Sequence, residues 1–288
     1  MSIGTATKKN PAGVMVTGAS TGIGRVTAEY LSTHGYRVFA GARKERDLEE
    51  LGRITNITAV QLDVCNTATI AAAVDQVTQS GIPLVGLVNN AGIARAGPLM
   101  ELPEQELQEQ FDVNVLGVHR VTRACFPLLR RTNGRIVMMS SNSGFFGTPF
   151  FGPYCMSKFA LEGYSDSLRR ELLLCGIKVI LIQPGRVITP IWEKGRSILE
   201  QFGAEQDNLS EFAHLGRKVG EYAIHKGVTA GLPPKAVAKV VYEALTSKNP
   251  KLRYLVAGDK LRYLLIKVLP ASRVDRMVEK ELKRLSMD

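Results

Sequence analysis

VMVTGASTGIG, residues 14–24, joins a short apolar run to a glycine-rich turn, and a helical pattern follows from Arg25 to about His34. The apolar run predicts a β-strand, so the order is strand, glycine turn and helix. This order is the setting of a dinucleotide-binding fingerprint, because glycines let the backbone approach a pyrophosphate and a helix N-terminus offers N–H donors. We therefore expect an α/β fold with a nucleotide at this turn; the alternative is a glycine turn that holds no ligand.

The same alternation of apolar runs and helical patterns continues along the chain. The predicted strands cover residues 37–42, 58–62, 84–88, 135–140, 177–182 and 252–256. The predicted helices between them cover residues 67–79, 104–131, 154–175 and 234–246. Near-continuous apolar strands are typical of a parallel sheet that is covered on both faces, so we predict a Rossmann-type, doubly wound parallel sheet in a single domain.

This single domain is expected to have three parts. Its core covers residues of about 13–258, and an insertion of about 186–232 lacks a strand pattern and is expected to shape the substrate region. A helical C-terminal extension covers about 259–288 and contains two helices with apolar stripes among Lys and Arg. Packing on the domain or on a second subunit is the favoured role for these stripes, and an anionic membrane surface is the alternative.

Composition narrows the class of protein further. In 288 residues, 45% apolar and 22% charged side chains are ordinary for a globular protein. The four cysteines lack C-x-x-C spacing, which argues against a metal site and favours reduced thiols in the cytoplasm. No signal peptide and no membrane-spanning run is apparent. Of the net charge of +10, residues 235–288 carry +7, from 13 Lys or Arg against 6 Asp or Glu. No aromatic residues are interleaved with this charge, so nucleic-acid binding is not expected.

The end of the second predicted strand bears on the choice of nucleotide. An acidic residue would bind the ribose 2′-hydroxyl of NAD about 18–20 residues after the last glycine. Ala42 lies there instead, followed by Arg43, Lys44 and Arg46. A guanidinium pairs with a 2′-phosphate that an acid would repel. The sequence therefore favours NADP over NAD, with Arg43 as the first candidate; the alternative is that Arg43 only ends the strand at the surface.

A tyrosine and a lysine, Tyr154 and Lys158, open the predicted helix 154–175. Residues four apart lie on one face of a helix, and an ammonium group beside a phenol lowers its pKa from about 10. The pair is therefore a candidate general acid/base. The alternative is a surface helix whose tyrosine merely faces the core.

Taken together, these motifs resemble those of the short-chain dehydrogenase/reductase family. TGASTGIG at 17–24 is similar to its cofactor turn, NNAG at 89–92 to the motif after its fourth strand, and Pro184-Gly185 with Thr189 to its segment near the nicotinamide. The resemblance implies a seven-stranded sheet and four catalytic residues: Asn114, Ser141, Tyr154 and Lys158. It also implies cofactor contacts from Gly18, Ser20, Thr21, Gly22, Ile23, Gly24, Arg43, Asp63, Val64, Asn90, Ala91, Gly92, Tyr154, Lys158, Pro184, Gly185, Val187 and Thr189.

In the family's mechanism, Tyr154 exchanges a proton with the substrate oxygen while hydride passes between nicotinamide and carbon. Lys158 would lower the pKa of Tyr154 and bond the nicotinamide ribose. Ser141 would hydrogen-bond the substrate oxygen, and Asn114 would hold a water that joins Lys158 to solvent. The resemblance therefore implies an enzyme acting on CH–OH groups with NAD(P).

Within the family, residues 150–158 and 165–172 and the long C-terminus look like the branch that acts on retinols and hydroxysteroids. The absence of an N-terminal hydrophobic anchor and the NADP-type site depart from its membrane-bound members. Apolar side chains near the site favour a lipophilic alcohol or ketone, such as a steroid, retinoid or lipid. The expected substrate-pocket residues are Ser143, Phe145, Phe151 and Trp192, with Phe150 nearby.

Other functions and partners stay open from the sequence. A reductase of 3-oxoacyl groups on an acyl carrier protein or coenzyme A is the main alternative, although its compact members mostly lack the long tail. A non-catalytic sensor or scaffold is a further alternative. A homodimer or homotetramer is expected by resemblance, through the helices at 104–131 and 154–175.

Overall fold

Seven parallel strands form one sheet in the computed structural model, which describes residues 11–193 and 210–287. The strand order is β3-β2-β1-β4-β5-β6-β7, so the chain reverses direction across the sheet between β1 and β4. In an open α/β sheet, such a switch point opens a crevice at the carboxyl ends of the strands. The strands are β1 (Gly13–Val16), β2 (Arg37–Ala42), β3 (Ile57–Gln61), β4 (Leu84–Asn89), β5 (Arg135–Met139), β6 (Lys178–Pro184) and β7 (Arg253–Val256).

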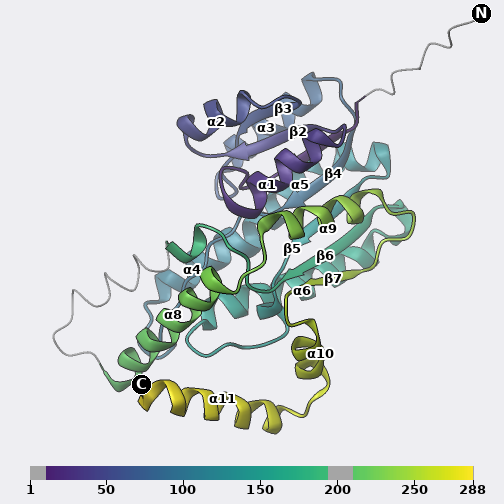
Figure 1. Ribbon diagram of the computed structural model, residues 1–288. Coiled ribbons are helices and arrows are strands. Elements are labelled where there is room, and N and C mark those ends of the chain that lie inside the picture. The colour runs from purple at the N-terminus through teal and green to yellow at the C-terminus, as the bar shows by residue number, and fades with distance from the viewer. Residues whose placement is uncertain (1–10, 194–209, 288) are drawn as a thin grey trace, which may run out of the picture.

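Helices cover both faces of the sheet, as Figure 1 shows. One face packs against α1 (Gly22–Thr33), α2 (Glu45–Gly52) and α9 (Pro234–Thr246). The other face packs against α3 (Thr67–Gln79), α5 (Gly117–Thr132) and α6 (Gly152–Glu171). Both sets of strand side chains are buried, which accounts for the near-continuous apolar runs in the sequence. The predicted doubly wound parallel sheet of seven strands is confirmed.

The helix predicted at 104–131 has an interruption that the sequence pattern did not reveal. It consists of α4 (Glu104–Phe111), a π-helical segment η1 (Asp112–Leu116) and α5. The N–H of Gly117 bonds to the carbonyl of Asp112, which is the wide π-helical spacing. Such segments insert an extra residue into a helix and are frequent at functional sites. Asn114 lies inside this segment and is buried.

Other differences from the predicted elements are small. The first helix begins at Gly22 rather than Arg25, and the helix predicted at 154–175 begins at Gly152 and ends at Glu171. A 3-10 turn, η3 (Leu173–Cys175), completes that stretch, and another, η2 (Asn142–Gly144), follows β5. Helix α2 was not predicted, because its eight residues are mostly charged and only Leu51 is buried.

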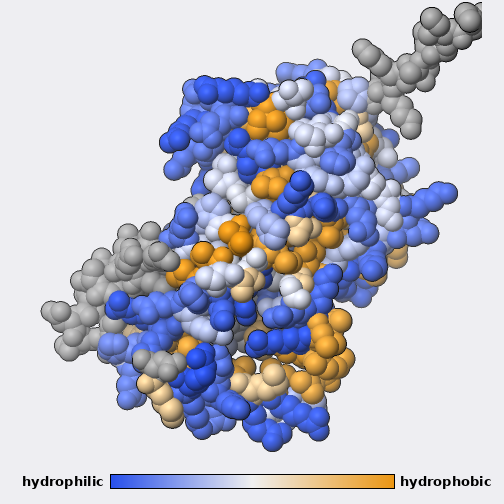
Figure 2. All heavy atoms as spheres, in the orientation of Figure 1, coloured by the Kyte–Doolittle hydropathy of each residue, from blue (hydrophilic) through white to orange (hydrophobic). Residues whose placement is uncertain are grey.

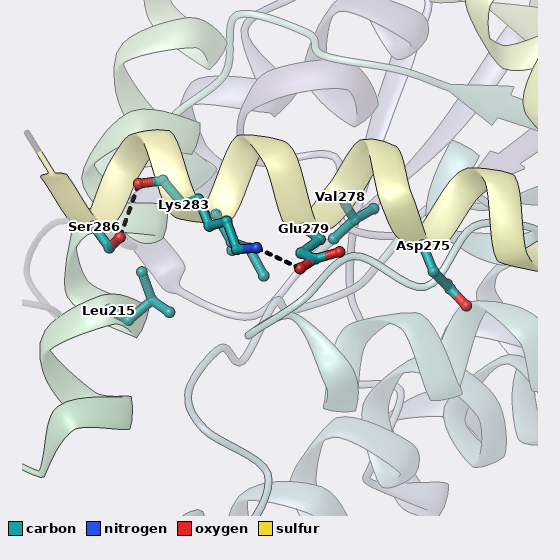
Figure 3. Close-up of a pocket in the computed structure, with 7 residues that line it drawn as sticks. Leu215, Asp275, Val278, Glu279, Lys283 and Ser286 are labelled. Atoms are coloured by element: carbon teal, nitrogen blue, oxygen red, sulfur yellow. Dashed lines mark hydrogen bonds and ion pairs between the residues drawn. The ribbon is translucent and has the colours of Figure 1, made fainter.

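Beyond β6, the chain forms helices that cover one end of the sheet. They are α8 (Glu211–Thr229), α10 (Lys260–Val268) and α11 (Ala271–Met287). α11 lies beside α8, and a cavity of about 320 Å³ between them is lined by Leu215, Val278 and Leu282 among others (Figures 1 and 3). Among the helices that the structure describes, none is both long and apolar enough to cross a bilayer.

Candidate active site

The glycine turn between β1 and α1 forms a cradle for a phosphate group. Gly18 and Gly22 have φ angles of 63° and 58°, a left-handed conformation that favours glycine. A Cβ on Gly24 would lie 2.2 Å from the carbonyl oxygen of Gly18 and 2.4 Å from the side-chain nitrogen of Asn90. No larger residue fits at Gly24 without moving this turn.

The first turn of α1 offers backbone N–H groups to an anion. Thr21 precedes the helix without a capping bond from its side chain, and the first turn contains no acidic residue. The positive end of the helix dipole is therefore not neutralised locally. A glycine cradle at such a helix end fits the pyrophosphate of a dinucleotide. Predicted contacts Ser20, Thr21 and Ile23 all lie in this turn.

Two loops that are distant in sequence close on the glycine turn. The side-chain nitrogen of Asn90 donates to the carbonyl oxygens of Thr17 (3.0 Å) and Gly18 (3.1 Å). The hydroxyl of Thr17 accepts from the N–H groups of Asn90 and Ala91, both at 3.0 Å. Thr17 therefore fixes the loop after β4, a role that the sequence analysis missed although Thr17 belongs to the quoted motif.

The segment after β6 approaches the same turn from the other side. A Cβ on Gly22 would lie 3.3 Å from the side chain of Thr189, so Thr189 sits against the glycine turn. Pro184 and Val187 are buried, and Gly185 is half-buried. The structure thus brings the predicted contacts from β1, β4 and β6 together at one edge of the sheet.

At the ends of β2 and β3, Arg43 and Asp63 lie side by side. Arg43 Nη1 is 4.0 Å from Asp63 Oδ2, and 66% of the Arg43 side chain is exposed. Asp63 also accepts from the N–H of Cys65 at 3.0 Å. Val64 is buried and Gly92 is exposed beside Asn114. Because the Arg43 side chain is mostly exposed and its contact with Asp63 is long, the guanidinium can turn towards a phosphate group.

Tyr154 and Lys158 lie one turn apart on α6, close to Ser141. Lys158 Nζ is 5.5 Å from the centre of the Tyr154 ring and donates to the carbonyl oxygen of Met139 at 2.8 Å. Burial lowers the pKa of Lys158 to about 8, although Glu162 opposes this shift. Lys158 is therefore an ammonium group whose proton is held less firmly than usual.

The pKa of Tyr154 differs from the expectation that Lys158 lowers it. Burial raises the pKa of Tyr154 to about 12, and the hydrogen bond with Ser141 opposes the rise only in part. Desolvation disfavours the phenolate more than the surroundings stabilise it. In this form of the protein, Tyr154 is a protonated group at neutral pH.

Asn114 contacts the active-site helix through Ser157 rather than Lys158. Its side-chain nitrogen donates to Ser157 Oγ (3.1 Å) and to the carbonyl of Ile93 (3.0 Å), and its oxygen accepts from the N–H of Ile93 (2.9 Å). Both side-chain N–H bonds are therefore engaged. Buried Gln110, also missed from the sequence, donates to Ile93 in the same way. The described contacts of the Asn114 side chain include none with Lys158, so the predicted bridging water stays a prediction.

A second polar cluster, centred on Glu162, lies one turn further along α6. Its Oε1 accepts from Ser140 Oγ (2.5 Å) and Gln183 Nε2 (2.9 Å), and its Oε2 accepts from Arg253 Nε (2.9 Å). Gln183 Oε1 accepts from Lys267 of α10 at 3.2 Å. This Glu162 cluster ties the ends of β5 and β6, and the residue before Ser141, to the C-terminal extension.

The aromatic residues expected in the substrate pocket have different surroundings. Trp192 donates to the carbonyl of Val187 at 2.7 Å and packs on Gly227 of α8, where a Cβ would lie 2.3 Å from its ring. Trp192 therefore holds α8 in place. Phe150 packs on Gly216 of α8 in the same manner.

The other three predicted pocket residues are close in sequence to Ser141 or to Tyr154. Ser143 is buried, and its N–H donates to Ser141 Oγ at 3.1 Å. Phe145 is half-buried and meets the ring of Tyr263 edge-on, with ring centres 6.3 Å apart. Phe151 is half-buried at the start of α6. Phe145 therefore gives the segment after Ser141 an apolar edge against α10, which we call the apolar rim of the site.

Comparisons with known proteins agree with this geometry. The model of the family described as short chain dehydrogenase matches residues 12–198. NADPH-dependent 3-dehydrocapnine reductase from Ornithobacterium rhinotracheale is 36% identical, with 95% of this chain and 98% of the relative covered. Retinol dehydrogenase 16 from Homo sapiens is 36% identical, with 92% and 87% covered. The solved structure of a short-chain dehydrogenase from Streptomyces avermitilis has a TM-score of 0.76 at 27% identity, over 97% of each chain. The chain belongs to the short-chain dehydrogenase/reductase family and is an oxidoreductase that acts on CH–OH groups or the corresponding carbonyls.

Proposed function

We propose that this protein reduces the carbonyl group of a lipophilic substrate with NADP(H), and that Tyr154 supplies the proton. The observation that carries the proposal is the position of Tyr154, which bonds to Ser141 and has Lys158 Nζ 5.5 Å from its ring. The glycine cradle at the start of α1 lies at the same edge of the sheet. These residues fit a nicotinamide dinucleotide.

Support for NADP over NAD comes from two sides. The exposed guanidinium of Arg43 ends β2, where an acidic residue would favour NAD. The relative from Ornithobacterium is an NADPH-dependent reductase. We therefore propose that Arg43 binds the 2′-phosphate of NADP. NAD is the alternative cofactor to be tested.

The residues of the site have separate roles in this reduction. The reduced nicotinamide, when bound, supplies the hydride that the carbonyl carbon receives. Tyr154 donates its proton to the carbonyl oxygen, and a pKa of about 12 keeps it protonated for this step. Ser141 donates a hydrogen bond that stabilises the charge developing on the same oxygen. Lys158 holds a positive charge beside the phenol, and Asn114 acts indirectly by positioning Ser157.

A lipophilic substrate suits the apolar rim of the site. Phe145 and Phe151 are half-buried aromatic residues that lie close in sequence to Ser141 and Tyr154. A relative of this chain is named as a retinol dehydrogenase, which supports an alcohol or ketone of low polarity. Steroid, retinoid and long-chain lipid ketones are therefore the classes to screen first, with 3-oxoacyl thioesters as the competing class.

We also propose that the protein forms a homodimer or homotetramer and that its subunits contact through η1 and α6. Leu116, Met156 and Phe159 are large apolar side chains that are between 45% and 49% exposed there. Such residues normally find a partner surface. All four cysteines lie in the described part of the chain and are free thiols, which supports the cytoplasm as the location.

The test replaces Tyr154 by Phe, which keeps the ring and removes the acid. We expect reduction by NADPH to lose nearly all of its kcat, while the Kd of NADPH stays within about twofold of wild type. Unchanged kcat in Tyr154→Phe would exclude this mechanism. Arg43→Ala, compared with wild type in kcat/KM for NADPH and NADH, tests the cofactor separately. If the ratio of the two kcat/KM values does not fall, Arg43 does not read the 2′-phosphate.

A further inference from the structure

The short helix α10 packs on the domain through its polar positions. Tyr263 and Lys267, one turn apart, both meet the ring of Phe145. Lys267 Nζ lies 3.9 Å from the centre of that ring and 3.2 Å from Gln183 Oε1. Tyr263 is the buried residue of this helix. The described contacts of α10 with Phe145 therefore come from an aromatic phenol and an ammonium group, while Ile266 of the same helix is half-buried.

The outward face of α10 is aliphatic. Leu261, Leu264, Leu265 and Val268 are 72%, 52%, 48% and 76% exposed. Figure 2 shows apolar residues gathered at the position of α10 in Figure 1. A surface helix of a globular protein normally has the opposite arrangement, with its apolar stripe towards the core. Exposed apolar residues gathered on one helix in this way mark an interaction site.

The neighbouring helix α11 does not share this feature. Its apolar residue Leu285 is buried, and Val278 and Leu282 line the same cavity as Leu215 of α8. Figure 3 shows this cavity. Lys218 of α8 also donates to a carbonyl oxygen of α11 at 3.2 Å. The structure therefore separates the two tail helices. Most of the α11 stripe is buried or half-buried, with Met277 at 49% exposed as the exception, whereas the four aliphatic residues of α10 are all exposed.

Basic residues surround the aliphatic face, and this charge indicates what covers it. α10 contains no acidic residue; its Lys260 and Arg262 are exposed, whereas its Lys267 bonds to Gln183. α11 adds exposed Arg273 and Arg276 nearby in the chain. A second copy that docked face to face would bring like charges together, which costs free energy. An anionic lipid surface attracts the same charges and also accepts the aliphatic side chains.

We propose that α10 docks on the surface of an anionic lipid bilayer. Its aliphatic residues Leu261, Leu264, Leu265 and Val268 lie among the lipids, and the exposed Lys260 and Arg262 lie at the headgroups. The helix is too short to span, so the contact is peripheral. Phe145 lies directly beneath α10, so docking brings the rim of the active site next to the bilayer. The proposal does not depend on which carbonyl is reduced, because binding to lipid is measured without turnover.

The test is sedimentation of the full chain with vesicles of phosphatidylcholine, with and without phosphatidylserine. We expect wild type to bind only the vesicles that contain phosphatidylserine, and more weakly as salt is raised. Leu264→Ser/Val268→Ser should lower the partition coefficient about tenfold or more, because each change removes buried methylene and methyl groups. The proposal is overturned if wild type binds neither kind of vesicle. It is also overturned if the double variant binds as strongly as wild type.

A matched control comes from the other end of the sheet. Leu173 and Leu174 are 66% and 101% exposed in the turn before β6, at the amino end of the strands, whereas α10 follows the carboxyl end of β7. Leu173→Ser/Leu174→Ser removes equivalent apolar area and should bind vesicles as wild type does. Equal losses in both double variants would overturn the assignment to α10.

A second copy is the competing occupant, and the molar mass in solution distinguishes it. Light scattering is measured on wild type and on Leu264→Ser/Val268→Ser without lipid. We expect the same mass for both, together with the loss of vesicle binding. A lower mass for the double variant, with vesicle binding retained, shows that the face is a contact between subunits and rejects the lipid surface. Thermal unfolding of both variants confirms that each is folded.

Discussion

Lys158 is a buried cation, so the stability of the ligand-free protein should depend on pH in a particular direction. Its pKa falls from 10.5 in an unfolded chain to about 8 in the folded protein. Between these two values the unfolded state binds more protons than the folded state. The free energy of unfolding therefore rises as the pH increases from 8 to 10.5. Below pH 8 both states hold the proton, and the protein bears the full cost of the buried charge.

The size of this effect follows from the difference between the two pKa values. At about 1.4 kcal/mol for each pKa unit, the whole interval corresponds to about 3.5 kcal/mol. Roughly 2.5 kcal/mol of it should appear between pH 7 and pH 10. Other buried groups act in the opposite direction. Burial raises the pKa of the Cys65 and Cys125 thiols to about 12, and that of Tyr154 to the same value, so these groups resist ionisation in the folded state.

The measurement is therefore a difference between two proteins. Urea unfolding of wild type and Lys158→Met is followed from pH 7 to pH 10 without cofactor and under reducing conditions. Met keeps an unbranched side chain but does not titrate. The contributions of the thiols and of Tyr154 to the pH dependence are the same in both proteins and therefore cancel in the difference. The free energy of unfolding of Lys158→Met minus that of wild type should be largest at pH 7. We expect this difference to be roughly 2.5 kcal/mol larger at pH 7 than at pH 10. A difference that is constant across this range would refute a buried, destabilised ammonium at Lys158.

Three further predictions concern the cradle, the Glu162 cluster and a helix cap. Gly24→Ala places a Cβ 2.2 Å from the Gly18 carbonyl, so NADPH binding measured by fluorescence should weaken at least about tenfold; wild-type affinity would contradict the tight turn. Glu162→Ala should lower the free energy of unfolding by about 3–5 kcal/mol and Glu162→Gln by less, since Gln keeps an acceptor; equal losses in urea unfolding would contradict this account. Asn66→Ala removes the cap of α3 and should cost about 1 kcal/mol in the same assay, with no loss meaning that the cap bonds are weak.

The elements that the sequence predicted well are those whose signal is local. The glycine turn and the spacing from Tyr154 to Lys158 each lie within a few residues, and the strands are continuous apolar runs. Their positions follow from chain periodicity and from the topology of a parallel sheet. The meeting of Thr189 with Gly22 also follows, because the carboxyl ends of parallel strands share one edge.

The features that the sequence did not reveal depend on contacts between distant segments. Glu162 looks like an ordinary surface residue of a helix, and its burial depends on Arg253, which is 91 positions away. The π-helical segment around Asn114 has no side-chain pattern of its own. The raised pKa of Tyr154 reflects its burial by segments that are distant in sequence, which spacing alone does not report. The outward face of α10 was equally invisible, because an apolar stripe does not say which way it points.

The segment between β6 and α9 leaves the sheet and returns to it at neighbouring points. Val187 and Leu232 form a parallel bridge, and the N–H groups of Ile188 and Leu232 bond to Leu232 and Arg186, both at 2.9 Å. The two ends of this segment are thus fastened together independently of what lies between them. Because each doubling of loop length adds only about 0.6 kcal/mol to the cost of closure, the interior can change in length and composition while the scaffold persists. A chimera that carries a relative's residues between Trp192 and Gly231 should keep this closure and the Thr189 contact. It should acquire a different preference for substrate when the contacts of α8 with Phe150 and α11 are retained.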